Sequence, residues 1–513
     1  MNTHPQILVL DFGSQYTQLI ARKIRELKVN SLILPWNTSI EKIRELAPRG
    51  VIFSGGPSSV YDVDAPQPEY RLEDLGVPIL GVCYGLQLCG RMLGATVLPG
   101  ESREYGLAQL KVVADPLFEG FAPESRVWMS HGDQLAGVPE GCSVLARTDT
   151  CPVAALHHPG LRLWGVQFHP EVQHTVHGRE LLRNFIFDIC GCTADWTAGH
   201  VIEEQVREIR ALVGDTAHVV CGLSGGVDSS VAAALIHRAI GDRLHCVYVN
   251  NGLMRAGESE EVVSTFREHL GFNLMAIDAS ERFMEALKGI SEPEQKRKAI
   301  GRTFIDVFEE AVRHLPQVEF LAQGTLYPDV IESVMTRGPS QTIKTHHNVG
   351  GLPERMKFRL LEPLRELFKD EVRQVGEGLG LPHAMLWRHP FPGPGLGIRI
   401  LGEISAERVR VLQEADRIFI EELRDSGWYD RTWQALAVLL PVHSVGVMGD
   451  QRTYENVLAL RAVNSTDAMT AEFVPLPWEL LGRISGRIIN EVRGINRVVY
   501  DISSKPPATI EWE

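Results

Sequence analysis

The chain has 513 residues, of which 44% are hydrophobic and 23% are charged, and its formal net charge at pH 7 is −14. This length exceeds what one hydrophobic core supports, and a prior of about 150 residues per domain suggests three globular domains. The acidic balance argues against a general nucleic-acid-binding protein, because binding along a phosphate backbone needs a broad positive potential.

The start of the chain and its hydropathy indicate the compartment. Residues 1–5 are not followed by the apolar core of a secretory signal, and the sequence contains no run of about 18 apolar residues. The eight cysteines are scattered and form no C-x-x-C pair, so we predict neither a disulfide framework nor a zinc site. We therefore expect a cytoplasmic protein with mostly buried thiols, no membrane partner and no nucleic-acid partner.

Residues 1–192 alternate short apolar stretches with amphipathic ones, and 16–27 reads as a helix. Such alternation is typical of an α/β domain with a largely parallel sheet. The strands that we predict here are 7–10, 31–34, 50–53 and 78–82.

The fourth of these strands runs into Gly81-Val82-Cys83-Tyr84-Gly85, and a helix-like segment follows. This turn parallels the G-x-S-x-G elbow, in which a tight strand-to-helix turn exposes a nucleophile above the sheet. A helix N-terminus also favours a thiolate. We therefore predict that Cys83 is a nucleophile rather than a buried structural thiol.

The expected partners of Cys83 follow two other strands. A strand at 163–168 leads into His169-Pro170-Glu171, where His169 would take the thiol proton and Glu171 would orient the imidazole. A Gly-Gly-Pro turn after the third strand offers backbone N–H groups. We predict that the N–H groups of Gly56 and Tyr84 form an oxyanion hole.

Two further domains follow a small, polar linker at 193–199. Residues 200–390 read as a second α/β domain, and residues 391–513 as a small mixed α+β domain that begins after a proline- and glycine-rich hinge. In the second domain we predict strands at 217–223, 244–250, 273–278 and 319–323. In the third we predict helices at 405–424 and 477–492 and strands at 435–446 and near 498–502.

A glycine-rich turn joins the strand at 217–223 to an alanine-rich helix. Paired glycines let a ligand approach the backbone, and the helix N-terminus favours phosphate. The lysine of a Walker A loop is missing, and Asp228 suggests Mg²⁺ on a pyrophosphate and cleavage of ATP between its α and β phosphates. A tight turn that binds nothing is the alternative. The predicted ATP-binding residues are Ser224, Gly225, Gly226, Val227, Asp228, Ser229 and Ser230.

Taken together, the two centres resemble the family of glutamine-hydrolysing GMP synthases over essentially the whole chain. The first domain resembles class I glutamine amidotransferases, and the second resembles N-type ATP pyrophosphatases with their S-G-G-x-D-S loop. Further segments that match the family are 321–325, 328–333, 343–353, 388–396 and the ending 504–513.

The resemblance implies that ATP adenylylates the C2 oxygen of xanthosine monophosphate (XMP). Ammonia from glutamine then displaces AMP, giving GMP, pyrophosphate and glutamate. It also implies that the third domain forms a homodimer, in which the apolar strand 436–440 pairs across a two-fold axis. The resemblance places Lys344, His346 and His347 on a lid over ATP, and places Arg497, Lys505, Thr509, Ile510 and Glu511 at XMP.

Two positions depart from the family pattern: Asn250 stands where many relatives have aspartate, and Ala468 where phenylalanine is common. A lost charge at position 250 would alter ATP affinity if that side chain touches the nucleotide. Three alternatives stay open: an amidotransferase of this type with another acceptor, a catalytically silent nucleotide-binding interaction protein, and a tRNA-thiolating enzyme. A tRNA-thiolating enzyme would require catalytic cysteines in the ATP domain and a broad basic face.

Overall fold

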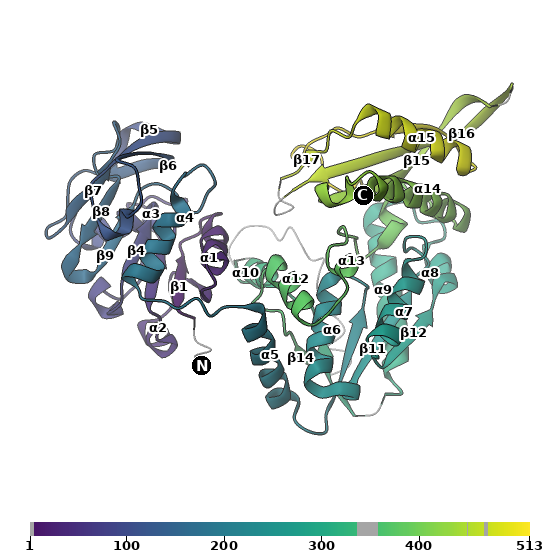
Figure 1. Cartoon of the computed structure of the whole chain (residues 1–513), viewed down its shortest axis with the longest axis horizontal. Coiled ribbons are helices and arrows are strands. Elements are labelled where there is room, and N and C mark those ends of the chain that lie inside the picture. Colours follow the sequence, from purple (N-terminus) through teal and green to yellow (C-terminus); the bar gives the residue numbers. More distant parts are fainter. Residues whose placement is uncertain (1–4, 316, 336–357, 449, 466–469) are drawn as a thin grey trace. The chain divides into compact units, whose positions relative to one another are not determined.

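The structure is a computed structural model that describes residues 5–315, 317–335, 358–448, 450–465 and 470–513. The chain forms two compact units, Met1–Val201 and Ile202–Glu513 (Figure 1). The predicted boundary at 390/391 lies inside the second unit. The predicted linker ends in the first turn of helix α5 (Ala198–Val213). Among the described residues no helix is both long and apolar enough to cross a membrane.

Unit 1 is built on a nine-stranded sheet in the order β2-β1-β3-β4-β9-β8-β7-β5-β6. The first five strands in this order are parallel to one another, and β1, β3, β4 and β9 are almost entirely buried. Burial on both faces explains why these strands are continuous apolar runs in the sequence. They are β1 (Ile7–Asp11), β2 (Ser31–Pro35), β3 (Gly50–Phe53), β4 (Ile79–Val82) and β9 (Leu163–Val166).

The rest of this sheet is antiparallel and was not predicted. The long pair β5 and β6 forms its edge, and the register of the pair shifts between Pro99 and Glu104. The sheet is therefore mixed, although the predicted α/β class is correct. The added strands are β5 (Val97–Val112), β6 (Glu124–Leu135), β7 (Ser143–Arg147) and β8 (Ala155–His158).

The helices of unit 1 include the one that follows Cys83. This helix, α3, is buried along most of its length and packs on β4 and β9, where a Cβ on Gly165 would lie 2.4 Å from Leu86 Cδ1. Ser39 caps α2 by accepting a hydrogen bond from the N–H of Lys42. The helices are α1 (Thr17–Glu26), α2 (Ile40–Leu46), α3 (Tyr84–Met92) and α4 (Gly178–Arg183).

Unit 2 contains a five-stranded, fully parallel sheet in the order β12-β11-β10-β13-β14. The order reverses between β10 and β13, and in open α/β sheets ligands bind beyond the carboxyl ends of strands at such a reversal. The strands are β10 (His218–Leu223), β11 (Leu244–Asn250), β12 (Leu274–Asp278), β13 (Val318–Ala322) and β14 (Arg359–Leu361).

The helices around this sheet and the carboxyl-terminal part of unit 2 share one hydrophobic core, which joins Val220 and Leu253 to Leu412 and Ile484. This shared core explains why residues on both sides of position 390 belong to one compact unit. The helices are α6 (Val227–Ile240), α7 (Glu258–Ser264), α8 (Ser280–Leu287), α9 (Pro293–Val312), α10 (Tyr327–Met335), α12 (Lys369–Gly378), α13 (His383–Leu386), α14 (Ala406–Asp425) and α15 (Trp478–Glu491).

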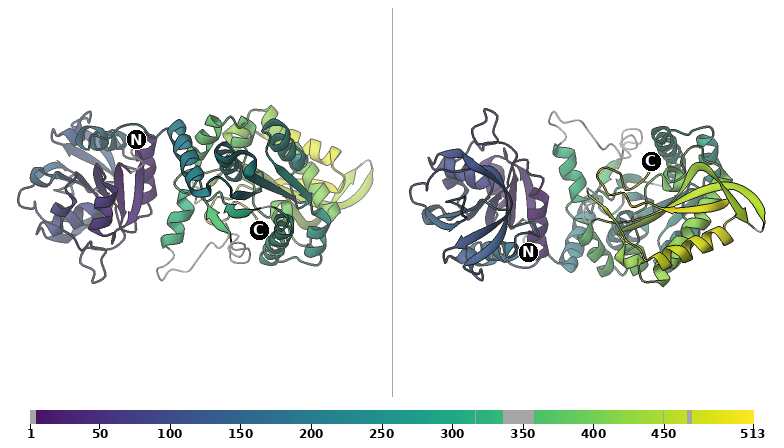
Figure 2. Two further views of the ribbon diagram at one scale, coloured as in Figure 1. Left: turned by 90° about the horizontal axis from the view of Figure 1, so that it is seen from below. Right: turned by 90° about the horizontal axis from the view of Figure 1, so that it is seen from above.

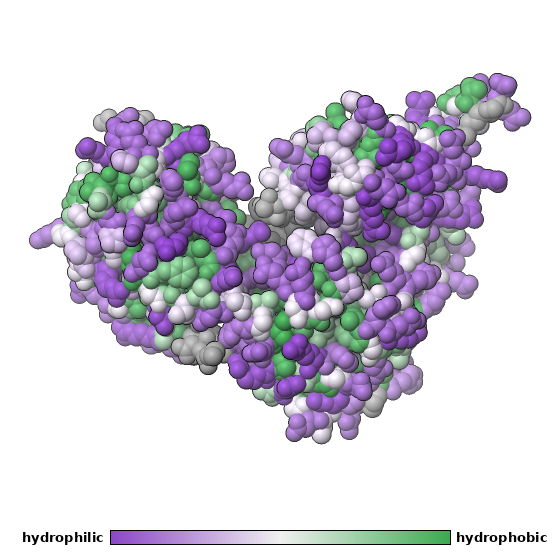
Figure 3. All heavy atoms as spheres, in the orientation of Figure 1, coloured by the Kyte–Doolittle hydropathy of each residue, from purple (hydrophilic) through white to green (hydrophobic). Residues whose placement is uncertain are grey.

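A second sheet of unit 2 is formed by β15 (Gln434–Met448), β16 (Gln451–Asn464), β17 (Glu472–Phe473) and β18 (Ile495–Tyr500). The antiparallel pair β15–β16 extends beyond the body of the unit as a twisted ribbon (Figures 1 and 2). Apolar side chains stay exposed towards its end, among polar surroundings (Figure 3). They are Val442, Val445, Val447 and Tyr454.

All eight cysteines are free, and all except Cys142 and Cys190 are buried, as expected from the sequence.

Candidate active sites

Cys83 lies on a tight turn between β4 and α3, with φ 53° and ψ −107°. This conformation is uncommon for a residue other than glycine. The glycines on either side make the turn sterically feasible: a Cβ on Gly81 would lie 2.7 Å from backbone atoms of Gly85, and one on Gly85 would lie 2.3 Å from the carbonyl oxygen of Phe53. The elbow therefore requires glycine at both positions.

Gly85→Ala should disrupt this elbow, because the added methyl group meets backbone atoms that cannot move without distorting β3. We expect the free energy of unfolding of unit 1 to fall by about 1–3 kcal/mol, as for other overpacked sites. Urea titration followed by fluorescence measures the change. Gly137→Ala is the matched control, because no atom lies within 4 Å of its added Cβ and its backbone is not in the left-handed region.

His169 follows β9, which pairs directly with β4, so the strands bring His169 and Cys83 together at one edge of the sheet. The imidazole Nδ1 lies 2.7 Å from Glu171 Oε1, and both side chains are almost fully buried. Burial opposes protonation of His169, but the charge of Glu171 and hydrogen bonds with Cys83 and Glu171 outweigh it and raise the pKa to about 11. The site thus stabilises a protonated imidazole beside Cys83, which is the form that His169 takes after it accepts a proton.

Glu171→Gln removes the negative charge that raises the pKa of His169 against the effect of burial. The pKa should therefore fall, and the neutral imidazole should dominate at pH 7. We expect kcat/KM of the reaction at Cys83 to fall by about 10²- to 10⁴-fold, as when the orienting carboxylate of other triads is lost. The rate of iodoacetamide alkylation of Cys83 against pH provides the test. An unchanged pH profile would show that Glu171 does not control the imidazole.

The predicted oxyanion hole adjoins these groups. The N–H of Gly85 donates to the carbonyl of Ser54 at 3.1 Å, which ties the loop after β3 to the elbow. A Cβ on Gly55 would lie 3.3 Å from His169 Cε1, and one on Gly56 would lie 2.6 Å from the carbonyl oxygen of Phe12. Tyr84 is the first residue of α3, where an N–H has no acceptor within the helix. The structure thus brings the predicted triad and oxyanion residues into one site.

Three residues of this site were not predicted from the sequence. Gln167 donates from Nε2 to Cys83 Sγ at 3.7 Å, and Gln87 donates to Gln167 Oε1 at 3.3 Å. The ring of Tyr16 meets the His169 ring edge-on at a centroid distance of 5.2 Å. Gln167 and Gln87 belong to segments that read only as a strand and a helix, so no local signal identifies them.

The loop between β10 and α6 forms the second candidate site. Gly225 has φ +73°, and the Ser224 hydroxyl lies 3.1 Å from the Ser229 hydroxyl and accepts a hydrogen bond from the N–H of Gly226. Ser230 donates to the carbonyl of Gly226 at 2.7 Å. These bonds hold the turn open at the start of α6, where first-turn N–H groups are available to a phosphate.

Asp228, in the first turn of α6, forms an ion pair with a lysine that the sequence analysis did not identify. Lys369 Nζ lies 2.5 Å from each carboxylate oxygen of Asp228. A Cβ on Gly324, in the loop after β13, would lie 3.1 Å from Asp228 Cβ. The carboxylate therefore lies at the reversal between β10 and β13, where the fold predicts a ligand site.

Two arginines complete the basic surroundings of this loop. Arg388 donates from Nη1 to the carbonyl of Gly225 at 2.5 Å and forms an ion pair with Glu258. Burial lowers the pKa of Arg373, and the charge of Asp228 opposes this shift. Arg388 lies in a segment that read as a hinge, and Lys369 is separated from Asp228 by 141 residues. Neither residue carries a motif that marks it as part of a phosphate site.

The oxygen donors of the loop suit magnesium, which prefers hard ligands and often takes only one or two carboxylates beside phosphate oxygens. Asp228 supplies one partly exposed carboxylate, and the hydroxyls of Ser224 and Ser229 lie on the same turn. In the structure Lys369 occupies both oxygens of that carboxylate. A metal ion at Asp228 would therefore compete with Lys369 for this carboxylate.

Of the five residues expected at XMP, two line one cavity, one lies in a small core and two lie outside both. Thr509 and Glu511 line a cavity of ≈ 680 Å³ at the end of the chain, whose lining includes none of the other three. Glu511 accepts from Arg399 at 3.0 and 2.8 Å, and Ile510 is buried in a small core. Arg497 donates to Ser444 Oγ at 2.7 Å, whereas the backbone of Lys505 pairs with Ala471.

Two other expectations concern positions away from this cavity. Asn250 accepts from the N–H of Gly252 at 3.0 Å and donates to Asp278 at 3.4 Å, so its side chain organises the loop after β11. Lys344, His346 and His347, expected on the lid, and Ala468 lie outside the described residues.

Family models match three parts of the chain: glutamine amidotransferase class-I over residues 8–189, NAD synthase over residues 200–302, and GMP synthase C terminal domain over residues 421–512. A protein of Carboxydothermus hydrogenoformans named "GMP synthase [glutamine-hydrolyzing]" is 58% identical over 509 residues, with 99% of each chain covered.

Proteins with the same name occur in Aquifex aeolicus, at 58% identity with 99% of each chain covered, and in Nitratidesulfovibrio vulgaris, at 56% identity with 100% of each chain covered. These matches run through the cysteine site, the glycine-rich loop and the carboxyl-terminal sheet. The chain therefore belongs to the family of glutamine-hydrolysing GMP synthases.

Proposed function

We propose that the chain converts XMP to GMP in two linked reactions. Unit 1 hydrolyses glutamine through Cys83, with His169 as base and Glu171 as its orienting partner. Unit 2 uses ATP to adenylylate the C2 oxygen of XMP, and ammonia then displaces AMP. Adenylylation converts a poor leaving group, the oxygen of a urea-like carbonyl, into a good one.

The observation that carries this proposal is the pairing of a buried Cys–His–Glu site with a lysine-free phosphate loop in one member of this family. His169 lies 2.7 Å from Glu171 and interacts with Cys83, which is an arrangement for cleaving an amide. The loop that begins at Ser224 offers N–H groups and a carboxylate, which suit a departing pyrophosphate. Neither centre alone would define a nitrogen-transfer reaction.

We also propose that Asp228 holds Mg²⁺ when ATP is bound. The ion would neutralise charge on the pyrophosphate as it departs, and Lys369 would then be free to contact a phosphate oxygen. Ser224 and Ser229 supply hydroxyls on the same turn. The internal hydrogen bonds of the loop fix the turn and hold Asp228 at the N-terminus of α6.

Further features of the proposal rest on the family pattern. Lys344, His346 and His347 act as a lid, and Thr509 and Glu511 contact XMP from the cavity that they line. Arg497, Lys505 and Ile510 stay candidates for the same ligand. The reaction takes place in the cytoplasm, where its nucleotide substrates are available.

The chain forms a homodimer through the β15–β16 ribbon in this proposal. Residues 436–439 are buried within the unit, so the exposed apolar side chains of the outer ribbon, Val447 at 76% and Tyr454 at 69% exposure, are the better contacts. Sedimentation velocity of Val447→Asp should show a monomer where the parent protein is a dimer.

Product analysis tests the main proposal. The protein is incubated with XMP, ATP, Mg²⁺ and either glutamine or ammonium, and the nucleotides are separated by chromatography. GMP together with AMP is expected from both nitrogen sources. Release of ADP would contradict the assignment of the loop. Formation of AMP with another acceptor but not with XMP would support the adenylylation reaction but show that XMP is not the substrate.

A further inference from the structure

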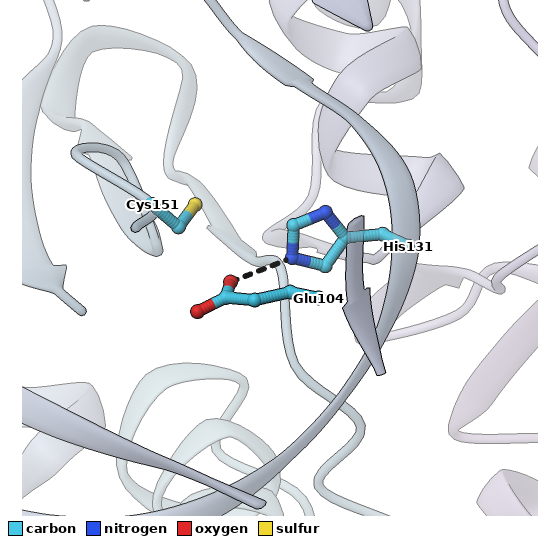
Figure 4. A group of neighbouring side chains, drawn as sticks. All are labelled: Glu104, His131 and Cys151. Atoms are coloured by element: carbon cyan, nitrogen blue, oxygen red, sulfur yellow. Dashed lines mark hydrogen bonds and ion pairs between the residues drawn. The ribbon is translucent and has the colours of Figure 1, made fainter. Parts of the chain in front are cut away.

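Glu104, His131 and Cys151 form a compact group of side chains beside the cysteine site in unit 1. They come from β5, β6 and the turn after β7, and their potential ligand atoms all lie within 4.8 Å of one another (Figure 4). His131 and Cys151 are buried, and the side chain of Glu104 is 14% exposed. Three different ligand types thus converge in a mostly enclosed place.

The environment of His131 orients one ring nitrogen towards the group. Nδ1 lies 3.0 Å from the carbonyl oxygen of Asp133, which can only accept, so Nδ1 carries a hydrogen. Nε2 lies 3.1 Å from Glu104 Oε2. Nε2 and Oε2 therefore point at each other, so that one cation can contact both atoms. A carbonyl on one nitrogen is the usual support of a metal-ligating histidine.

The other two side chains are also fixed from behind. Glu104 Oε1 accepts from Thr148 Oγ1 at 2.9 Å and from Thr150 Oγ1, which leaves Oε2 as the oxygen that faces His131. The N–H of Cys151 donates to Thr148 Oγ1 at 2.9 Å, so one threonine positions both residues. Such supporting bonds hold ligands in place before an ion arrives.

We propose that Glu104, His131 and Cys151 form a zinc site with a fourth position open to water or another small ligand. Zinc accepts sulfur, nitrogen and oxygen donors in a tetrahedral arrangement, and sites with three protein ligands keep an open position. Zinc–ligand bonds of about 2.0–2.3 Å place neighbouring donors about 3.3–3.6 Å apart. The Nε2–Oε2 distance of 3.1 Å needs little adjustment to meet this range.

Metal binding at this place changes the state of Cys151. Zinc binds cysteine as a thiolate, so the Cys151 thiol has to lose its proton when the metal binds. Zinc binding should therefore release about one proton from the thiol at neutral pH. The site also adjoins the nucleophile, because the carbonyl of Ser130, next to His131 on β6, lies 3.7 Å from Cys83 Sγ.

Cobalt titration of the full chain tests the site directly, because cobalt reports both thiolate ligation and tetrahedral geometry by absorbance. The titration uses Cys83→Ala protein, so that the nucleophilic thiol does not contribute. We expect one equivalent of cobalt to give a thiolate charge-transfer band in the near ultraviolet and visible bands of a tetrahedral complex. Zinc should remove these bands by competition, with release of about one proton per ion in weak buffer.

Variants then assign the bands to the three residues. Cys151→Ser should abolish the charge-transfer band, and Glu104→Gln should weaken cobalt affinity by at least about 100-fold, more than loss of a supporting group causes. Cys142→Ser, at a half-buried thiol of the same unit, should leave the titration unchanged. Circular dichroism checks that each variant is folded.

Two results would overturn the proposal. Absence of any cobalt band at micromolar protein would mean that His131 and Glu104 contact only each other and bind no metal. Bands that persist in both Cys151→Ser and Glu104→Gln would place the metal elsewhere. The proposal does not depend on the acceptor of unit 2, since the titration contains neither nucleotide nor glutamine.

Discussion

Replacement of Cys83 with alanine should abolish GMP formation from glutamine and leave GMP formation from ammonium within about twofold of the parent protein. The physical reason is that Cys83 belongs to unit 1, whereas the phosphate loop belongs to unit 2. Loss of a catalytic nucleophile lowers kcat by about 10⁶-fold in hydrolases with a triad, so residual glutamine use should be undetectable. Initial rates with each nitrogen source, measured at saturating XMP and ATP, give the comparison.

Cys142→Ala is the matched control for this experiment, because Cys142 is a half-buried thiol of the same unit and lies outside the triad. It should keep both activities. If Cys83→Ala lost the ammonium-dependent reaction in parallel with the glutamine-dependent one, the division of labour between the units would be wrong. Circular dichroism of the variant separates this outcome from misfolding.

Replacement of Asp228 with alanine should lower AMP release by about 10³-fold or more with either nitrogen source. The variant removes the carboxylate proposed to hold Mg²⁺ and leaves Lys369 without its partner at the loop. Loss of one group that stabilises developing charge costs about 10²- to 10³-fold in other enzymes, and here a metal ligand is lost as well. Release of ³²P-labelled pyrophosphate from γ-labelled ATP measures the step.

Asp242→Ala provides the control, since Asp242 is an exposed carboxylate in the turn that follows α6. Asp228→Asn separates charge from shape: it should be nearly as inactive as the alanine variant, and excess Mg²⁺ should restore little activity. Normal turnover by Asp228→Asn would falsify the metal role. Glutamine hydrolysis in unit 1 should survive in both Asp228 variants.

The parallel strands and the residues at their ends could be predicted from the sequence. The strand that leads to Cys83 and the one that leads to Ser224 are buried on both faces, so each appears as an uninterrupted apolar run before a glycine turn. Parallel strands place their carboxyl ends at one edge, which is why His169 and Cys83 come together without any sequence proximity.

The antiparallel parts could not be predicted in the same way. β5 contains Pro99, Gly106 and several charged residues, which normally indicate turns, and its pairing with β6 supplies the structure that its own sequence does not favour. β16 is exposed in its first half and buried in its second, so it lacks a constant alternation of polar and apolar residues.

Site residues that are brought together by long-range contacts could not be predicted from the sequence either. Lys369 contacts Asp228, which lies 141 positions away in the sequence. The scattered cysteines predicted no zinc site, so nothing in the sequence singled out Cys151. Its partners Glu104 and His131 come from other strands of the sheet and share no spacing pattern with it. Such groups become visible only when the strands are paired.

The separation of the chain into two compact units bears on how the protein should respond to heat. In the part of the chain that the structure describes, unit 1 has one sheet and unit 2 has two, and no sheet is shared between them. A single melting temperature therefore need not describe the chain, and calorimetry should be analysed as two transitions. Under the proposed function, synthesis from ammonium depends only on unit 2, whereas synthesis from glutamine needs both units folded. The ratio of the two rates during heating therefore reports which unit melts first.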